Sequence, residues 1–233
     1  MDKNSLMKKR KIEDIIRSLC LTIKCNMEVN TVWTEYSLRK ELVACILGSQ
    51  VRYEMAASAL NRIEQAGLLK DQWWRKTDKI FESELYKVLL NEASLNEGNG
   101  SYRFSKLRAH QLFVTRNSIV EKSLYEMLFN EDDPRLKRKL FIDKVTGFGP
   151  KQASMFIRNT GASYDLAVLD THVLNFMIMQ NILHEKQINI SKLLVYERIE
   201  SIIKDYSRLI GYPIGYLDWA IWATMKAAKG MNA

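Results

Sequence analysis

Leu140–Met177 has the sequence LFIDKVTGFGPKQASMFIRNTGASYDLAVLDTHVLNFM. The stretch begins as a helix that ends near Val145, because Gly147 and Gly149 favour a turn over a continued helix. Pro150 fits the first turn of a new helix, and apolar residues recur after it at helical spacing. A tight turn at a helix N-terminus exposes main-chain N–H groups that bind phosphate without any side chain. The alternative is an ordinary turn between two helices that binds no ligand.

The remainder of the chain also favours helices. Only three prolines and ten glycines occur, and apolar residues recur at three- and four-residue spacing. This spacing predicts helices over about 6–27, 34–47, 53–65, 77–91, 104–115, 119–130 and 133–144. Gly67 is a plausible C-terminal cap for the third of these helices, and Pro134 suits the first turn of the last. The segment 92–102 gathers Asn, Gly and Ser without periodicity and is predicted to be a loop.

Length and charge set broad limits on function. A chain of 233 residues suits one large domain or two small ones that share a cleft. The net charge of +8 weakly favours a polyanionic partner, through release of counterions from phosphates. No run of about 20 apolar residues suggests a membrane span, and the N-terminus lacks the features of a secretory signal. We therefore expect a cytoplasmic protein.

The cysteines do not suggest a cofactor. Cys20, Cys25 and Cys45 are odd in number and have no C-x2-C spacing, which argues against a disulfide framework or a zinc site. An iron–sulfur cluster needs four thiolates, so none is expected within one chain. We expect no required cofactor.

Several motifs resemble those of the helix-hairpin-helix DNA glycosylase superfamily. They are V-x-G-F-G-P-K-x-A-S-x-F-I-R-N followed by L-A-V-L-D-T-H in the first stretch, ELVACILGSQVRYEMAASALNRIEQAGLL, YRFSKLRA and GYLDWAIWA. The chain is most similar to the compact, archaeal-type 8-oxoguanine glycosylase/lyases, over about residues 35–225. The resemblance implies an all-α, two-lobed fold with DNA in the cleft between the lobes. One lobe would comprise 1–33 and 165–233, and the other 34–164, with the hairpin at about 136–160.

Lys151 is the candidate nucleophile. It lies in the first turn of the helix after the hairpin, where the partly positive helix N-terminus disfavours a protonated amine. A neutral amine can attack C1′ of a deoxyribose and form a Schiff base. The alternative is a solvated or phosphate-binding lysine, and the resemblance favours the nucleophile.

Asp170 is the candidate carboxylate partner. It follows the apolar run Leu166–Leu169 and precedes a helical run, so it is also expected to be an N-cap. A carboxylate at this place can stabilise the oxocarbenium-like charge that develops as the N-glycosidic bond breaks. The capping and catalytic roles are compatible.

The resemblance also implies residues that contact DNA. A flipped base leaves a gap in the duplex, and the segment that contains Gln50 and Arg52 would lie at this gap, with Gln50 as the wedge or the reader of the orphaned base. The alternative is an ordinary turn between two helices. His172 would contact a phosphate, although a switchable acid/base or a buried structural histidine is the alternative. Arg103, Lys106 and Arg108 form a basic cluster that either contacts phosphate or is a surface charge run.

The flipped base requires an aromatic or apolar slot. The candidates for the slot are Phe148, Met155, Trp219 and Trp222, with Asp218 as an acceptor for a purine N–H. Core packing is the alternative for the aromatic residues. The resemblance further implies a monovalent cation, Na⁺ or K⁺, held by main-chain carbonyls around Asp143, Val145 and Phe148.

Two departures leave the excised base open. The compact enzymes end in a lysine whose terminal carboxylate lies in the base pocket, whereas this sequence continues as K-A-A-K-G-M-N-A. The insertion around 92–102 is also longer. We expect a monomer that removes 8-oxoguanine from double-stranded DNA at the nucleoid and cleaves the abasic site by β-elimination. The alternatives are a glycosylase for another base, such as a bulky modification in viral DNA, and a non-catalytic DNA-binding module.

Overall fold

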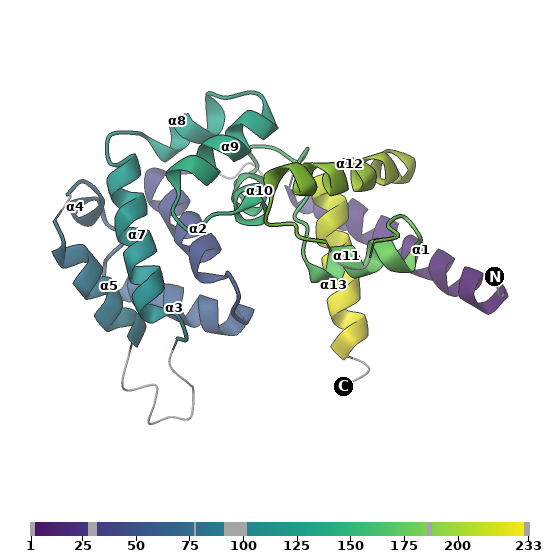
Figure 1. The fold of residues 1–233 in the computed structure, drawn as a ribbon, viewed down its shortest axis with the longest axis horizontal. Coiled ribbons are helices and arrows are strands. Elements are labelled where there is room, and N and C mark those ends of the chain that lie inside the picture. Colours follow the sequence, from purple (N-terminus) through teal and green to yellow (C-terminus); the bar gives the residue numbers. More distant parts are fainter. Residues whose placement is uncertain (1–2, 28–31, 77, 91–101, 186–187, 231–233) are drawn as a thin grey trace. The chain divides into compact units, whose positions relative to one another are not determined.

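The computed structural model describes residues 3–27, 32–76, 78–90, 102–185 and 188–230 (Figure 1). Within these residues every regular element is a helix, which confirms the all-α prediction. None of these helices is both long and apolar enough to cross a membrane.

The chain divides into two compact units. Unit 1 comprises Met1–Val32 and Gly149–Ala233, and unit 2 comprises Trp33–Phe148. The division falls between Phe148 and Gly149, whereas the sequence suggested a boundary at about 164/165. The difference arises because the helix after the hairpin is tied to the C-terminal helix by a buried ion pair between Arg158 and Asp218.

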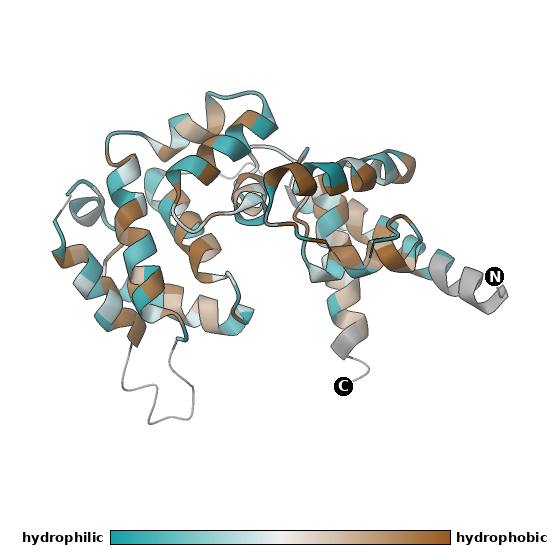
Figure 2. Ribbon diagram, viewed as in Figure 1, coloured by the Kyte–Doolittle hydropathy of each residue, from teal (hydrophilic) through white to brown (hydrophobic). Residues whose placement is uncertain are grey.

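Unit 1 contains α1 (Lys3–Met27), α10 (Pro150–Asn159), α11 (Thr171–Met179), α12 (Leu193–Ile210) and α13 (Ile214–Gly230). The C-terminal α13 packs against α1, α11 and α12, so the two ends of the sequence share one core (Figure 1). Members of that core include Ile16, Phe176, Ile203, Leu217 and Ile221. In Figure 2, α12 alternates apolar and polar residues, as an amphipathic helix at the edge of a core should.

Unit 2 contains α2 (Glu35–Leu47), α3 (Tyr53–Gln65), α4 (Asp71–Trp74), α5 (Ile80–Leu90), α7 (Ser105–Ile119), α8 (Leu124–Phe129) and α9 (Pro134–Lys144). The central α2 packs on α3, α7 and α8, and α5 lies along α7. Most of these helices were expected, including α3 with the bounds found. The short α4 and, in unit 1, the long α12 were not expected.

Helix ends follow local chemistry. Asp133 caps α9, accepting from the N–H of Arg135 at 2.7 Å, and proline occupies the first turn as expected. Gly67 follows the end of α3 with a φ of +70°, in the left-handed region that favours glycine. The predicted loop at 92–102 lies outside the described residues except for Tyr102.

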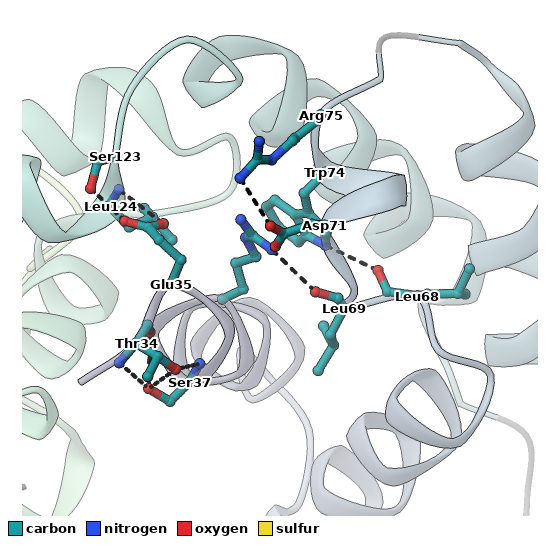
Figure 3. Close-up of polar contacts among 11 residues, drawn as sticks. Thr34, Glu35, Ser37, Leu68, Leu69, Asp71, Trp74, Arg75, Ser123 and Leu124 are labelled. Atoms are coloured by element: carbon teal, nitrogen blue, oxygen red, sulfur yellow. Dashed lines mark hydrogen bonds and ion pairs between the residues drawn. The ribbon is translucent and has the colours of Figure 1, made fainter. Parts of the chain in front are cut away.

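Polar contacts tie the start of α2 to α4 and α8 (Figure 3). Glu35 accepts hydrogen bonds from the N–H groups of Leu124 (3.3 Å) and Tyr125 (3.0 Å), and so caps α8 from outside. Arg39 forms an ion pair with Asp71 at the beginning of α4. These contacts fix the short helices around α2, which leads into the predicted DNA-facing turn.

Candidate active site

The hairpin turn has the geometry of an anion-binding helix N-terminus. The N–H of Phe148 donates to the carbonyl of Val145 (3.0 Å), and Gly147 between them has a φ of +95°. Gly149 is the N-cap of α10, and no side chain caps the helix there. The first N–H groups of a helix have no intrahelical acceptor, so an uncapped start leaves them for a ligand such as phosphate.

Lys151 occupies the first turn of α10 in unit 1. Its side chain is half-buried, and among the described residues its ammonium group forms no ion pair or hydrogen bond. Met155 follows one helical turn later and is also half-buried, so the two residues lie on one face of the helix. A primary amine that no carboxylate engages is placed to act as a nucleophile.

Asp170 is the N-cap of α11, as its position in the sequence predicted. It adopts an extended conformation, and its Oδ1 accepts the N–H of Val173 at 2.9 Å. The side chain is half-buried, and its Oδ2 has no hydrogen-bond partner among the described residues. One carboxylate oxygen therefore fixes the side chain while the other is left for a substrate.

Buried side chains hold the main chain that leads to Asp170. The residues 166–169 are buried and not helical. Three successive N–H groups donate to side chains of α12 and α13: Ala167 to Glu200 (2.9 Å), Val168 to Asp218 (2.5 Å) and Leu169 to Tyr196 (3.0 Å). Buried N–H groups need such partners, and here the partners also fix the position of the segment.

Asp218 does not have the role of purine acceptor that the sequence suggested. It is 1% exposed, and one carboxylate oxygen accepts from Arg158 Nη1 while the other accepts from the Val168 N–H. Burial raises the pKa of Asp218 to about 7, against the opposing effects of Arg158 and the Val168 N–H. Since both oxygens are engaged inside the protein, Asp218 is not placed to accept from a purine, and that expectation is corrected.

The residues predicted to form the aromatic slot lie in both units. Trp219 and Trp222 are half-buried on α13, with the guanidinium of Arg158 5.2 Å from the Trp219 ring and Lys226 Nζ 4.8 Å from the Trp222 ring. Phe148 is buried and belongs to unit 2. A base pocket formed by these residues with Met155 stays a prediction.

In unit 2, Gln50 lies at an exposed turn in a strained conformation. Its φ is +63°, in the left-handed region that a residue with a Cβ rarely adopts. The turn is held from inside by Tyr102, whose hydroxyl donates to the carbonyl of Leu47 (2.6 Å), and by Arg108, which donates to the carbonyl of Ser49 (2.7 Å). An exposed side chain on a braced turn is suited to enter a DNA gap.

Arg108 was grouped with Arg103 and Lys106 as either a phosphate contact or part of a surface charge run, and its burial agrees with neither alternative. It is 4% exposed, and besides Ser49 it donates to Gln111 Oε1 (2.6 Å). Its neighbours Arg103 and Lys106 are exposed, as is Arg52 beyond the Gln50 turn. These three stay predicted phosphate contacts, as does the half-buried His172, whose ring has no hydrogen bond within the described part of the chain.

The groups predicted to bind a monovalent cation are main-chain carbonyl oxygens, which are suitable ligands for Na⁺ or K⁺. Asp143 lies in the last turn of α9, where main-chain carbonyls have no intrahelical partner. Val145 and Phe148 follow in the turn, and the Val145 carbonyl accepts the Phe148 N–H through one lone pair. No cluster of three His, Cys, Asp or Glu side chains suited to a metal occurs among the described residues. The cation site therefore stays a prediction based on carbonyls alone.

Sequence reasoning did not identify Arg158, Tyr196, Glu200 or Tyr102 as parts of the site. Arg158 and Tyr102 both lie within motifs that were recognised, but nothing in the motifs showed what their side chains contact. The helix that carries Tyr196 and Glu200 could have been found, since apolar residues recur through α12 at three- and four-residue spacing. The contacts of Tyr196 and Glu200 with residues 166–169 could not have been found in this way, because they depend on how the helices pack.

Comparison with known proteins agrees with the fold and the motifs. A family model described as 8-oxoguanine DNA glycosylase matches residues 23–212. Two archaeal proteins, both called 8-oxoguanine DNA glycosylase/AP lyase, are similar in sequence. That of Picrophilus torridus is 29% identical over 81% of this chain and 78% of its own, and that of Korarchaeum cryptofilum is 30% identical over 81% and 80%.

Solved structures confirm the helix-hairpin-helix glycosylase fold. The 8-oxoguanine DNA glycosylase of Methanocaldococcus jannaschii has a TM-score of 0.66 at 23% identity, covering 94% of both chains. The Thermotoga maritima enzyme has a TM-score of 0.62 at 24% identity, covering 94% of this chain and 93% of its own. A complex of the M. jannaschii glycosylase/lyase with a 15-mer DNA containing 8-oxoguanine has a TM-score of 0.65 at 22% identity, over 93% and 95%. Because the family model covers most of the sequence, the chain belongs to the helix-hairpin-helix 8-oxoguanine DNA glycosylase family.

Proposed function

We propose that this protein is a bifunctional DNA glycosylase that removes 8-oxoguanine from double-stranded DNA and then cleaves the abasic site by β-elimination. The observation that carries the proposal is the pair of groups in unit 1. Within the described residues, Lys151 has no acidic partner, and Asp170 presents one carboxylate oxygen that accepts no hydrogen bond. The names of the archaeal relatives support the same activity.

The two residues divide the chemistry. The neutral amine of Lys151 attacks C1′, the C1′–N9 bond breaks, and its electron pair leaves with the base. The carboxylate of Asp170 stabilises the positive charge that develops on the sugar, and can accept a proton from the attacking amine. The nitrogen lone pair then breaks the C1′–O4′ bond, O4′ takes up a proton as the sugar ring opens, and C1′ and the lysine nitrogen are joined as a Schiff base. The Schiff base acidifies C2′, and loss of a C2′ proton expels the 3′-phosphate and breaks the strand.

DNA would be held by main-chain and side-chain groups together. The uncapped start of α10 would bind a phosphate, with His172 as a further contact. Gln50 would fill the gap left by the flipped base. A monovalent cation held by the carbonyls of Asp143, Val145 and Phe148 would stabilise the hairpin and attract phosphate, and no bond-breaking step depends on it. The protein would act as a monomer on DNA of the nucleoid.

The proposal is tested on a duplex with a single 8-oxoguanine. The wild-type protein should release the free base and break the strand without added alkali, and Lys151→Gln should do neither while it still binds the duplex. Product analysis over a panel of duplexes, each with another damaged base, tests the substrate. Release of a different base in preference would overturn the assignment of 8-oxoguanine, and binding without any product would overturn the enzymatic function.

A further inference from the structure

Asp218 on α13 joins the two elements that carry the proposed reacting groups. Its side chain is buried, with 1% exposed. One oxygen forms an ion pair with Arg158 on α10, and the other accepts the Val168 N–H at 2.5 Å. One carboxylate thus bridges the helix of Lys151 and the segment of Asp170.

Both arms of this bridge end close to a reacting group. Arg158 follows Lys151 by seven residues, which places the two on one face of α10 about 10 Å apart along the axis. Val168 precedes Asp170 by two residues, or roughly 7 Å of extended chain. Only a short length of main chain, helical on one side and extended on the other, therefore separates the bridge from each proposed reacting group.

The close approach of α13 fixes where Asp218 can lie. The N–H of Gly215 donates to the carbonyl of Tyr164 at 2.9 Å. A Cβ at Gly215 would lie 3.1 Å from the Tyr164 main chain and 3.3 Å from Arg158 Cγ, so the absence of a side chain at this position allows the close approach. The carboxylate three residues later is thereby set against both of its partners.

Glu200 and Tyr196 hold the same segment from α12, where they accept the N–H groups of Ala167 and Leu169. Asp218 holds the segment from α13 and also forms an ion pair with Arg158 on α10. The Asp218 bridge therefore acts on the separation between the amine and the carboxylate, in addition to holding the segment.

We propose that Asp218 is a positioning residue for excision, and that its bridge to Arg158 and Val168 sets the separation of the Lys151 amine from the Asp170 carboxylate. The inference rests on the proposed function. Its physical basis is the steep dependence of rate on geometry, since displacement of a reacting group by about 1 Å can lower a rate roughly 100-fold.

Asp218→Asn, Arg158→Met and the double variant test this inference. Asn keeps the size of Asp, and its one carbonyl oxygen can serve only one of the two arms. The readouts are the single-turnover excision rate at saturating protein, and the Kd for a duplex with a stable abasic-site analogue. Each single variant should lose about 10- to 100-fold in rate with little change in Kd. The double variant should be no slower than the slower single variant, because both changes break one bridge.

Ile210→Ala is the matched control for a general loss of stability. Ile210 is buried in the unit 1 core at the end of α12. This variant should melt at a lower temperature, yet keep the wild-type excision rate at temperatures where it is folded.

The outcomes separate this inference from the proposed function. Wild-type excision together with an unimpaired Asp218→Asn would overturn the inference alone. So would multiplicative losses in the double variant, or equal losses of rate and DNA affinity. A folded wild-type protein that releases no base from any duplex would overturn the proposed function and this inference with it.

Discussion

Asp170 combines a structural contact and an open carboxylate oxygen in one side chain. Its Oδ1 caps α11 through the Val173 N–H, and its Oδ2 has no partner among the described residues. The cap restricts the rotamer of the side chain, so the open oxygen is held in place before substrate binds. Such preorganisation is what makes a fixed charge effective in catalysis.

Asp170→Asn separates the two roles. The amide oxygen of Asn can still accept the Val173 N–H, so the free energy of unfolding should change by less than about 0.5 kcal/mol. The loss of charge should slow base release about 100- to 1000-fold. Thermal unfolding and single-turnover excision measure the two effects. Asp170→Ala is the control, since it should also destabilise α11 by about 1 kcal/mol. An Asn variant with wild-type excision would leave Asp170 with the capping role alone.

Among the structural elements, the hairpin has two glycines, and glycine is present at each position for a different structural reason. Gly147 has a φ of +95°, and a Cβ there would lie 2.7 Å from the side chain of Gln111. Gly149 has a φ of −105°, and a Cβ there would meet only Gln152 Oε1, at 3.6 Å. The first glycine is therefore required by the protein, and the second leaves space at the uncapped helix start.

Alanine at each glycine should give different results. Gly147→Ala should lower the free energy of unfolding by about 1–2 kcal/mol, because a Cβ in the left-handed region is strained. Gly149→Ala should leave stability nearly unchanged but weaken DNA binding, because its methyl group would crowd an approaching phosphate. Chemical denaturation and a binding titration measure both. Wild-type affinity in Gly149→Ala would argue against a phosphate at this turn.

The start of α7 offers a second matched pair, in which two basic residues two positions apart have different surroundings. Lys106 is exposed, whereas Arg108 is buried against the Ser49 carbonyl. The logarithm of the DNA-binding constant falls as the logarithm of the salt concentration rises. Lys106→Met should make this slope less steep by about 0.9, as loss of one phosphate contact does. Arg108→Met should leave that slope unchanged, and should lower stability by about 1–3 kcal/mol because it leaves buried acceptors unpaired.

Excision assays extend the same comparison. If Arg108 braces the Gln50 turn, Arg108→Met should slow excision from a duplex more than from a single strand, since only the duplex has a gap to fill. DNA binding measured over a range of salt concentrations decides between the roles. Equal loss of slope in the two variants would show that Arg108 contacts phosphate after all.

At the scale of the whole molecule, local chemistry made most of the helices predictable. Pro134, Pro150, Asp133 and Gly67 act on neighbouring residues, so their effects can be inferred from a short window of sequence. The capping role of Asp170 was predictable for the same reason. The chain's division between Phe148 and Gly149 was not, because it depends on contacts of α10 with distant residues.

The corrections concern buried charges with distant partners. Arg108 and Ser49 are 59 residues apart, and Asp218 lies 60 residues from Arg158. A charged residue near a functional motif suggests a ligand contact when only the sequence is known. The burial of these two side chains, and therefore their role, is decided by how the helices pack.

The buried Asp218 should make stability depend on pH. Its pKa is raised to about 7 from 3.8, and Arg158, Asp170 and Cys20 are the other ionisable groups that interact with it. Between these pH values the native protein holds a proton at Asp218 that the unfolded chain has lost. The stability from this group is thus fully present below about pH 4 and is lost as the pH rises through about 7.

Comparison with Asp218→Asn isolates this effect, because Asn does not titrate. From pH 4 to 7 the wild-type protein should lose stability relative to the variant, by up to about 1 kcal/mol per pH unit. Urea unfolding at several pH values gives the difference. A difference that stays constant over this range would show that the pKa of Asp218 is the same in the folded and unfolded states.

The central claim is that Lys151 forms the covalent bond to DNA. Borohydride reduction during reaction with an 8-oxoguanine duplex should trap the protein on the DNA, and mass spectrometry of the digested adduct should place the sugar remnant on Lys151. Lys151→Gln should give no adduct, and Lys144→Gln, which changes a lysine of the preceding helix, should give the wild-type adduct. Trapping on any other residue, or an undiminished adduct in Lys151→Gln, would contradict the account.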